Sequence, residues 1–410
     1  MSEAGRGKTP TSSRAQQGIC FSRAGRKSRS LATLGMTIGV FNLHAQPAPT
    51  TPSRDYLVLV ASEAVDKVAL VRFGPKGAAV ERERYVGWSP TEVAGPHGLA
   101  VSPDKKSFFV STAHGTPFGR LQKLNTTTLA QEGSVMLGNF PATMQVSPDG
   151  YYVYVVNFNL HGEMAASDVS VVAAQEMVEI ARINTCTMPH GSRFSADGTH
   201  HYSVCMMDET LVEIDTRTLS VSRHFFLTAG KEMGMTGAPT QRGSTATHDM
   251  SGHGMTPPAP GDVSCSPTWA QPSTDNSRVW VACNKSSDIV EIDAKNWKLA
   301  RRIPAGPGVY NLGLTHDGSK LIGTNKRDQS VSVIDAVSGK ELARIKTTRA
   351  VVHGAAVSDD DRYAFISIEG MGSQPGTVDV IDSSTLTKVA SVDLGQQAGG
   401  IDFLRSEVLK

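Results

Sequence analysis

The sequence has no motif for covalent haem attachment and no closely spaced cysteine pair. Neither Cys-x-x-Cys-His nor Cys-x-x-Cys occurs among its 410 residues, which argues against a c-type cytochrome, a zinc ribbon and a thioredoxin-type redox pair. Charged residues make up only 19% of the chain and the net charge is +1, so neither a coiled coil nor a disordered chain is expected. No basic stripe interleaved with aromatic residues occurs, and we expect no nucleic-acid partner.

Long apolar runs are also absent. The best candidate, residues 31–43, has 13 residues, whereas a membrane helix needs about 20. It follows a basic segment, residues 23–29, and precedes the small residue Ala45, which is the order of a secretory signal. We predict that residues 1–45 are a signal peptide or an N-terminal anchor and that residues 46–54 are a linker. The mature chain is then periplasmic or secreted, with no membrane span.

The chain has 39 glycines and 21 prolines, which mark the turns of a repeated unit. Each unit has a short first strand, a turn of the Ser-Pro-Asp-Gly kind, a second β-rich strand, a third strand ending in Val-x-Ile-Asp and an amphipathic fourth strand. Equivalent positions lie 42 to 48 residues apart, except for one step of 78. These positions are His97, Ala142, His190, Thr268, Asn311 and His353. A period of about 40–50 residues is typical of a four-stranded propeller blade.

The two ends of the chain complete one further unit. Residues 396–403 have the pattern of a first strand, and residues 55–86 supply second, third and fourth strands without a first. Pairing the two ends closes a ring and removes exposed sheet edges. We therefore predict an all-β fold, a seven-bladed β-propeller of four-stranded blades over residues 55–404. The C-terminal strand pairs with the N-terminal blade, and residues 405–410 form a tail.

The repeats resemble those of a known family. Tyr154-Val-Val-Asn157, the Ser-Pro-Asp-Gly turns and the Val-x-Val-Ile-Asp strands are similar to those of bacterial YVTN-type seven-bladed β-propellers, whose blades are WD40-like. The resemblance covers roughly residues 55–404 and implies the fold. Because propellers carry many unrelated activities, function must be argued from the residues that meet at a site.

Propeller geometry places several histidines on one face of the disc. The start of a first strand and the end of a second strand share a face, because the two strands form a hairpin. His97, His190 and His353 occupy the first-strand position around the channel, and His114 and His161 follow second strands. The remaining histidines of the repeats are expected on the surface elsewhere: His200, His201, His224 and His316.

The cysteine count agrees with export. Apart from Cys20 in the leader, the chain has four cysteines: Cys186, Cys205, Cys265 and Cys283. An even number in an exported chain allows two disulfides, with three possible pairings. Positions within the repeat favour a local pair within each of two blades, 186 with 205 and 265 with 283, and thiolate ligation of a metal is the alternative.

The long step contains an insertion, residues 229–262, that is rich in methionine and histidine. Its candidate ligands are Met233, Met235, His248, Met250, His253 and Met255. Glycine and proline argue against regular structure there. Thioether sulfur suits Cu(I), and imidazole suits copper in either oxidation state. The segment resembles the copper-collecting loops of periplasmic copper proteins, and we predict that it acts as a lid over the channel or as a metal-delivery arm.

The sequence leads to three functional hypotheses. The first is a monomeric, exported propeller that holds copper with the histidines of one face, a layout similar to the propeller of nitrous oxide reductase, although a cupredoxin domain is missing. The second is a hydrolase, because Pro-His-Gly resembles a fragment of lactonase-type propellers. There His97, His190, Arg193 and Glu369 would polarise a lactone carbonyl and activate water. The third is a scaffold that binds a periplasmic protein or a cell-wall component.

Overall fold

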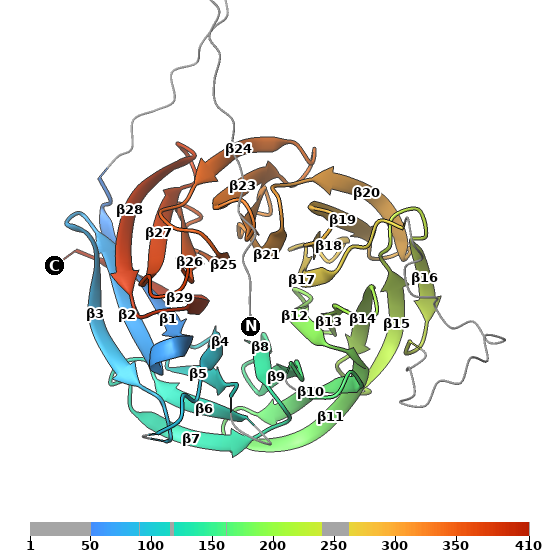
Figure 1. Cartoon of the computed structure of the whole chain (residues 1–410), viewed down its shortest axis with the longest axis horizontal. Helices are drawn as coiled ribbons and strands as arrows, with labels where there is room; N and C mark the ends of the chain where they lie inside the picture. The colour runs from blue at the N-terminus through green and yellow to red at the C-terminus, as the bar shows by residue number, and fades with distance from the viewer. Residues whose placement is uncertain (1–50, 90, 115–118, 161, 240–261, 410) are drawn as a thin grey trace, which may run out of the picture. The chain divides into compact units, whose positions relative to one another are not determined.

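The structure, a computed structural model, describes residues 51–89, 91–114, 119–160, 162–239 and 262–409. Regular structure in these ranges is almost entirely β-strand, with one short 3-10 helix, η1 (Glu63–Val65). The strands form seven antiparallel sheets that are arranged in a ring (Figure 1). The predicted all-β, seven-bladed propeller is confirmed.

We name the blades A to G and give the strands of each from the centre outward. Blade A has β29 (Ala398–Val408), β1 (Arg54–Ser62), β2 (Lys67–Gly74) and β3 (Gly77–Tyr85). Blade B has β4 (Pro96–Val101), β5 (Ser107–Thr112), β6 (Arg120–Asn125) and β7 (Gln131–Met136). Blade C has β8 (Pro141–Val146), β9 (Tyr152–Asn157), β10 (Ala166–Ala173) and β11 (Val178–Thr187).

Blade D has five strands, β12 (Pro189–Phe194), β13 (His200–Cys205), β14 (Thr210–Asp215), β15 (Ser220–Phe226) and β16 (Met233–Thr236). Blade E has β17 (Pro267–Pro272), β18 (Arg278–Cys283), β19 (Asp288–Asp293) and β20 (Lys298–Pro304). Blade F has β21 (Val309–Leu314), β22 (Lys320–Asn325), β23 (Ser330–Asp335) and β24 (Glu341–Lys346). Blade G has β25 (Val352–Val357), β26 (Tyr363–Ile368), β27 (Gly376–Asp382) and β28 (Thr387–Leu394).

The ring closes as the sequence predicts. Strand β29, from the C-terminal end, pairs antiparallel with β1, and Val58 lies opposite Phe403 in the register. Strand β29 also continues to Val408, where its last residue pairs with Arg54. Residues 405–408, expected to form a tail, therefore extend the strand, because β1 offers backbone partners over its whole length.

Apolar side chains fill the space between neighbouring blades. Leu57 and Leu70 of blade A pack in one cluster with Val101 and Phe108 of blade B. Middle strands are covered by a blade on each side, so they read as continuous apolar runs. Burying each large apolar side chain between two blades contributes about 1.5–3 kcal/mol. The outer strands, by contrast, face solvent on one side, and most of β3 is exposed.

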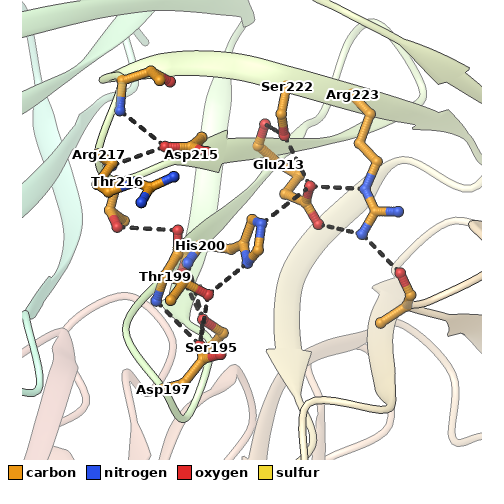
Figure 2. Close-up of polar contacts among 12 residues, drawn as sticks. Ser195, Asp197, Thr199, His200, Glu213, Asp215, Thr216, Arg217, Ser222 and Arg223 are labelled. Atoms are coloured by element: carbon orange, nitrogen blue, oxygen red, sulfur yellow. Dashed lines mark hydrogen bonds and ion pairs between the residues drawn. The ribbon is translucent and has the colours of Figure 1, made fainter.

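The Ser-Pro-Asp-Gly turns are hairpin turns stabilised by their own side chains. In blade D the Ser195 hydroxyl donates to Asp197 Oδ1 at 2.7 Å, and the Thr199 backbone N–H donates to the same oxygen at 3.1 Å (Figure 2). Although burial alone would raise the pKa of Asp197, these hydrogen bonds lower it. The turns connect first and second strands on the face opposite the predicted histidine face.

The beginning of the Met/His-rich insertion is regular, contrary to the expectation. Strand β16 pairs with β15, so that Met233 lies opposite Phe226 and Met235 opposite His224. It covers the open edge of β15, and Gly234 allows close approach to blade E, because a Cβ there would lie 2.3 Å from the Trp297 carbonyl oxygen. His248, Met250, His253 and Met255 lie outside the described residues.

Two of the four histidines expected on the surface are buried, so that expectation was wrong for them. His201 is 0% exposed, and its ring lies 4.8 Å from that of Tyr154 and 4.7 Å from that of Phe194. His224 is also buried, and its Nδ1 donates to the Gly237 carbonyl oxygen at 2.7 Å. Both lie on strand faces that pack between blades. His200 and His316 lie at the solvent-exposed turns.

Both predicted disulfides are present. Cys186 pairs with Cys205, and Cys265 pairs with Cys283. The first bridge joins β11 of blade C to β13 of blade D, and the second lies within blade E. The two bridges indicate an oxidising, non-cytoplasmic compartment and exclude the alternative of thiolate ligation. In the part of the chain that the structure describes, no helix is long and apolar enough to cross a membrane.

Removing the blade E disulfide should destabilise the fold. The bridge joins residues 18 apart, and closing a loop of this size contributes about 3 kcal/mol by constraining the unfolded chain. We expect the Cys265→Ala/Cys283→Ala variant to lose about this free energy of unfolding in urea. A denaturation curve that coincides with that of the oxidised parent would contradict the assignment.

Candidate functional site

The second residue of each innermost strand lies on a β-bulge. In every blade the first residue pairs with the last residue of the second strand, as Pro96 does with Thr112, and the register shifts directly afterwards. A bulge bends the strand and re-aims a side chain. The residues at this position are His97, Ala142, His190, Thr268, Tyr310, His353 and Gly399.

Hydrogen bonds between blades hold six of these bulges. The carbonyl oxygen of the second residue accepts a hydrogen bond from the preceding blade, and we call this set the carbonyl ring. Its donor–acceptor pairs are Ser111–Ala142, Thr143–His190, His190–Thr268, Thr268–Tyr310, Thr324–His353 and Ser367–Gly399. All six distances are between 2.5 and 2.9 Å. The donor is a side chain in every case, a hydroxyl in five and the His190 ring in one.

Glycine in the Pro-His-Gly motif has a structural role. A Cβ at Gly98 would lie 1.9 Å from the Ala142 carbonyl oxygen of the next blade, and a Cβ at Gly191 would lie 2.3 Å from the Thr268 carbonyl oxygen. Only glycine therefore lets neighbouring inner strands approach this closely. The motif positions the preceding histidine and is not by itself a catalytic signature.

Six aromatic and imidazole rings form a closed circuit at the channel mouth, which we call the collar. In order around the channel they are His97, Phe140, Phe158, His190, Tyr310 and His353. Successive ring centroids lie 4.9 to 5.8 Å apart, and the His353–His97 contact of 5.6 Å closes the circuit. The structure thus brings together three histidines that are up to 256 residues apart in the sequence.

Glu63 of η1 bridges two histidines. His97 Nδ1 donates to Glu63 Oε2 at 2.8 Å, and His114 Nε2 donates to Oε1 at 2.6 Å. Burial alone would raise the pKa of Glu63, but the charge of His97 and the hydrogen bonds from His114 and His97 hold it well below its usual range. The hydrogen bond to Glu63 in turn raises the pKa of His114.

A second charged pair lies beside His353. Lys326 Nζ donates to Glu369 Oε1 at 2.8 Å, the same oxygen lies 3.6 Å from His353 Nε2, and the ammonium lies 4.3 Å from the centre of the Tyr310 ring. Burial would lower the pKa of Lys326, but the Tyr310 ring and Glu369 raise it, so the side chain stays cationic. Burial lowers the pKa of His353 well below its usual value, and its ring is neutral at pH 7.

The three collar histidines differ in which ring nitrogens have partners. His190 uses both, because Nδ1 donates to the Thr268 carbonyl oxygen and Nε2 accepts from the Tyr310 hydroxyl at 3.1 Å. By contrast, His97 Nε2 and His353 Nδ1 are buried without a hydrogen-bond partner among the described residues. A neutral His97 that donates from Nδ1 carries its lone pair on Nε2.

Of the other predicted ligands, His114 lies next to the collar, because its Nε2 donates to Glu63 and its ring lies 5.2 Å from that of Phe140. His161 lies outside the described residues. Met233 and Met235 lie on β16 at the outer rim of blade D, away from the collar (Figure 1). Across the described ranges, no group of three or more His, Cys, Asp or Glu side chains is arranged to hold a metal ion.

Sequence reasoning missed five residues of the site, namely Glu63, Phe140, Phe158, Tyr310 and Lys326. Glu63, Phe158 and Lys326 directly follow second strands, as Glu369 does, so comparison of this position in all blades would have found them. The repeat alignment placed Asn311 at the first-strand position, but Val309 pairs with Asn325, which makes Tyr310 the second residue of β21. That assignment was wrong by one residue, because the first strand of blade F does not begin with a proline.

No family model matches the chain, and no curated protein matches it. Hydrazine synthase of Kuenenia stuttgartiensis has 19% identity over 76% of this chain and 90% of that chain, with a TM-score of 0.57. The periplasmic gluconolactonase PpgL of Pseudomonas aeruginosa has 17% identity over 85% and 99%, with a TM-score of 0.61. A functionally unknown protein from Desulfotomaculum acetoxidans has 11% identity over the same shares, with a TM-score of 0.60. These similarities show a shared propeller fold.

The Glu63–His114 pair should give a measurable pH signature. Because the folded pKa of His114 is raised, its stabilising contribution is complete below pH of about 6.5 and is lost as pH rises through the folded pKa. We expect Glu63→Gln to lower the pKa of His114 in an NMR titration and to cost more stability at pH 6 than at pH 9. An unchanged His114 titration would contradict the pairing, with His316 as the internal reference.

Proposed function

We propose that the channel mouth is the active site of a hydrolase that acts on a small cyclic ester. One observation carries the proposal: Glu63 holds His97 by Nδ1 at 2.8 Å, while His97 Nε2 is buried at the channel without a described partner. A carboxylate that orients an imidazole in this way leaves the other nitrogen as a general base and stabilises the imidazolium that forms.

The proposed reaction consumes one water and opens the ring. His97 Nε2 accepts a proton from water as the water oxygen bonds to the carbonyl carbon of the ester. The ring C–O bond then breaks, and the leaving alkoxide takes the proton back from His97, which gives a hydroxy acid. The Lys326 ammonium provides positive charge in the same collar for the oxyanion of the intermediate.

Two further observations support this class of reaction. One of the similar structures is a gluconolactonase on the same fold, which shows that the fold can carry such chemistry. Of the four residues that the lactonase resemblance implied, His97 has the geometry of the base and Glu369 anchors Lys326. His190 instead acts in the carbonyl ring and the collar, since both its nitrogens are engaged.

Lactone hydrolysis by chelator-treated protein tests the proposal. We expect turnover of glucono-1,5-lactone or another small lactone in a pH-stat assay, and a loss of kcat of at least about 100-fold in His97→Asn. His316→Asn is the matched control, because His316 pairs with Asp361 at 2.7 Å on the opposite face. Full activity of the His97 variant, or no turnover of any lactone by the parent, would rule out the proposal.

Copper binding is the second proposal. His97 Nε2 and His353 Nδ1 have no hydrogen-bond partner among the described residues, and the centroids of the two rings lie 5.6 Å apart. Imidazole is a good copper ligand. In this proposal the Met/His-rich segment, residues 240–261, delivers the ion. The wider setting that we propose is a monomeric, YVTN-type protein in the periplasm.

Copper content separates the two proposals. We expect protein purified from a periplasmic fraction to contain copper, and we expect His97→Asn/His353→Asn to weaken Cu(I) binding against a competing chelator at least tenfold. Deleting residues 240–261 should slow uptake without removing the channel site. Equal copper affinity in the parent and the double variant would end this proposal, and absence of the protein from the periplasm would contradict the proposed setting.

A further inference from the structure

The channel contains an arginine that makes no ion pair within 4 Å with any carboxylate of the described residues. Arg193, on β12, donates from Nη1 to the Ser192 carbonyl oxygen at 2.9 Å, and its guanidinium stacks on the Trp269 ring at 4.3 Å. None of the ion pairs found among the described residues includes it. Burial lowers the pKa of Arg193 to about 10, although the negative charge of Asp402 acts in the opposite direction. Arg193 is therefore a cation at neutral pH, and leaving such a charge unpaired is costly.

Arg193 lines a small cavity in the channel. Trp269, Asn311, His97 and His353 line the same cavity, with backbone from the glycines of the inner strands. Its volume of about 30 Å³ corresponds to two or three water-sized positions, since one such position takes about 10–15 Å³. The cavity is thus large enough for a carboxylate and one or two attached atoms.

Unpartnered polar atoms are concentrated around this cavity. Of the eleven buried side-chain polar atoms without a hydrogen-bond partner in the described chain, four belong to its lining residues. They are Trp269 Nε1, Asn311 Oδ1, His97 Nε2 and His353 Nδ1. The first is a donor and the second is an acceptor, and each imidazole nitrogen is an acceptor in the tautomer that carries its proton on the other ring nitrogen.

We propose that this cavity binds a small hydroxycarboxylate. The carboxylate pairs with Arg193 and accepts a hydrogen bond from Trp269 Nε1. The hydroxyl donates to Asn311 Oδ1 or to one of the imidazole nitrogens. A carboxylate without a hydroxyl would pair with Arg193 but would give no hydrogen-bond donor to Asn311 Oδ1 or the imidazole nitrogens. A neutral diol would donate to these acceptors but would not pair with Arg193. The inference goes beyond ester hydrolysis, because it needs only these binding groups and no proton transfer by His97.

Isothermal titration calorimetry of the chelator-treated full chain with glycolate, acetate and ethylene glycol tests the proposal. We expect glycolate to bind about tenfold more tightly than acetate, which corresponds to about one hydrogen bond to an otherwise unpaired acceptor, and ethylene glycol to give no binding. Arg193→Met should weaken glycolate binding at least tenfold. Trp269→Phe keeps an aromatic ring but removes the N–H, and we expect an intermediate loss.

Arg223→Met is the matched control. Arg223 also stacks on a tryptophan, Trp297, at 4.0 Å, but it has a carboxylate partner, Glu213, at 2.6 Å (Figure 2). Its loss should leave glycolate binding unchanged. If Arg193→Met does not fold, Arg193→Lys keeps the charge and Trp269→Phe gives an independent reading.

Two results would overturn the inference. One is glycolate affinity equal to that of acetate, and the other is unchanged glycolate affinity in the folded Arg193 and Trp269 variants. Lactone turnover measured on the same samples keeps the two proposals apart. Glycolate binding without hydrolysis supports this inference and counts against the hydrolase, whereas hydrolysis without glycolate binding does the opposite.

Discussion

Hydrogen bonds from one blade to the next, at the second residue of six of the seven inner strands, are the constraint on which the channel depends. Each bond of the carbonyl ring ties a side chain of one blade to a backbone oxygen of the next, at the bulge that turns the second side chain toward the channel. The same bonds that hold the blades together therefore fix the positions of His190 and His353, whereas His97 is held by its hydrogen bond to Glu63. Ring closure by β29 and β1 completes this arrangement.

Within this frame the polar groups of the channel fall into two kinds. Some are satisfied inside the protein, as Glu63 is by two histidines and Lys326 is by Glu369. Others have no described partner, and each such buried group costs about 1–3 kcal/mol. Their concentration around one small cavity, beside Arg193, which makes no ion pair with another described residue, is the main reason to regard the channel as a binding site and not as packing.

The fold could be predicted from the sequence because its determinants are local and repeated. Turn residues, strand patterns and the incomplete units at the two ends define seven blades, and the cysteine positions within the units indicate the pairing. The site was only partly predictable. Glu63 comes from the closing blade, whose repeat is split between the chain ends, and Tyr310 depends on a register that only the pairing of Val309 with Asn325 defines. The burial of His201 depends on which strand face a neighbouring blade covers.

In this view the channel atoms that have no partner among the described residues contact a ligand. The most direct measurement is a crystal structure of the full chain grown with a small hydroxycarboxylate. We expect electron density for the ligand between Arg193 and the collar, with its carboxylate on the guanidinium and its hydroxyl on an imidazole nitrogen or Asn311. Ordered water alone at all of these atoms, with the ligand bound elsewhere or absent, would contradict it.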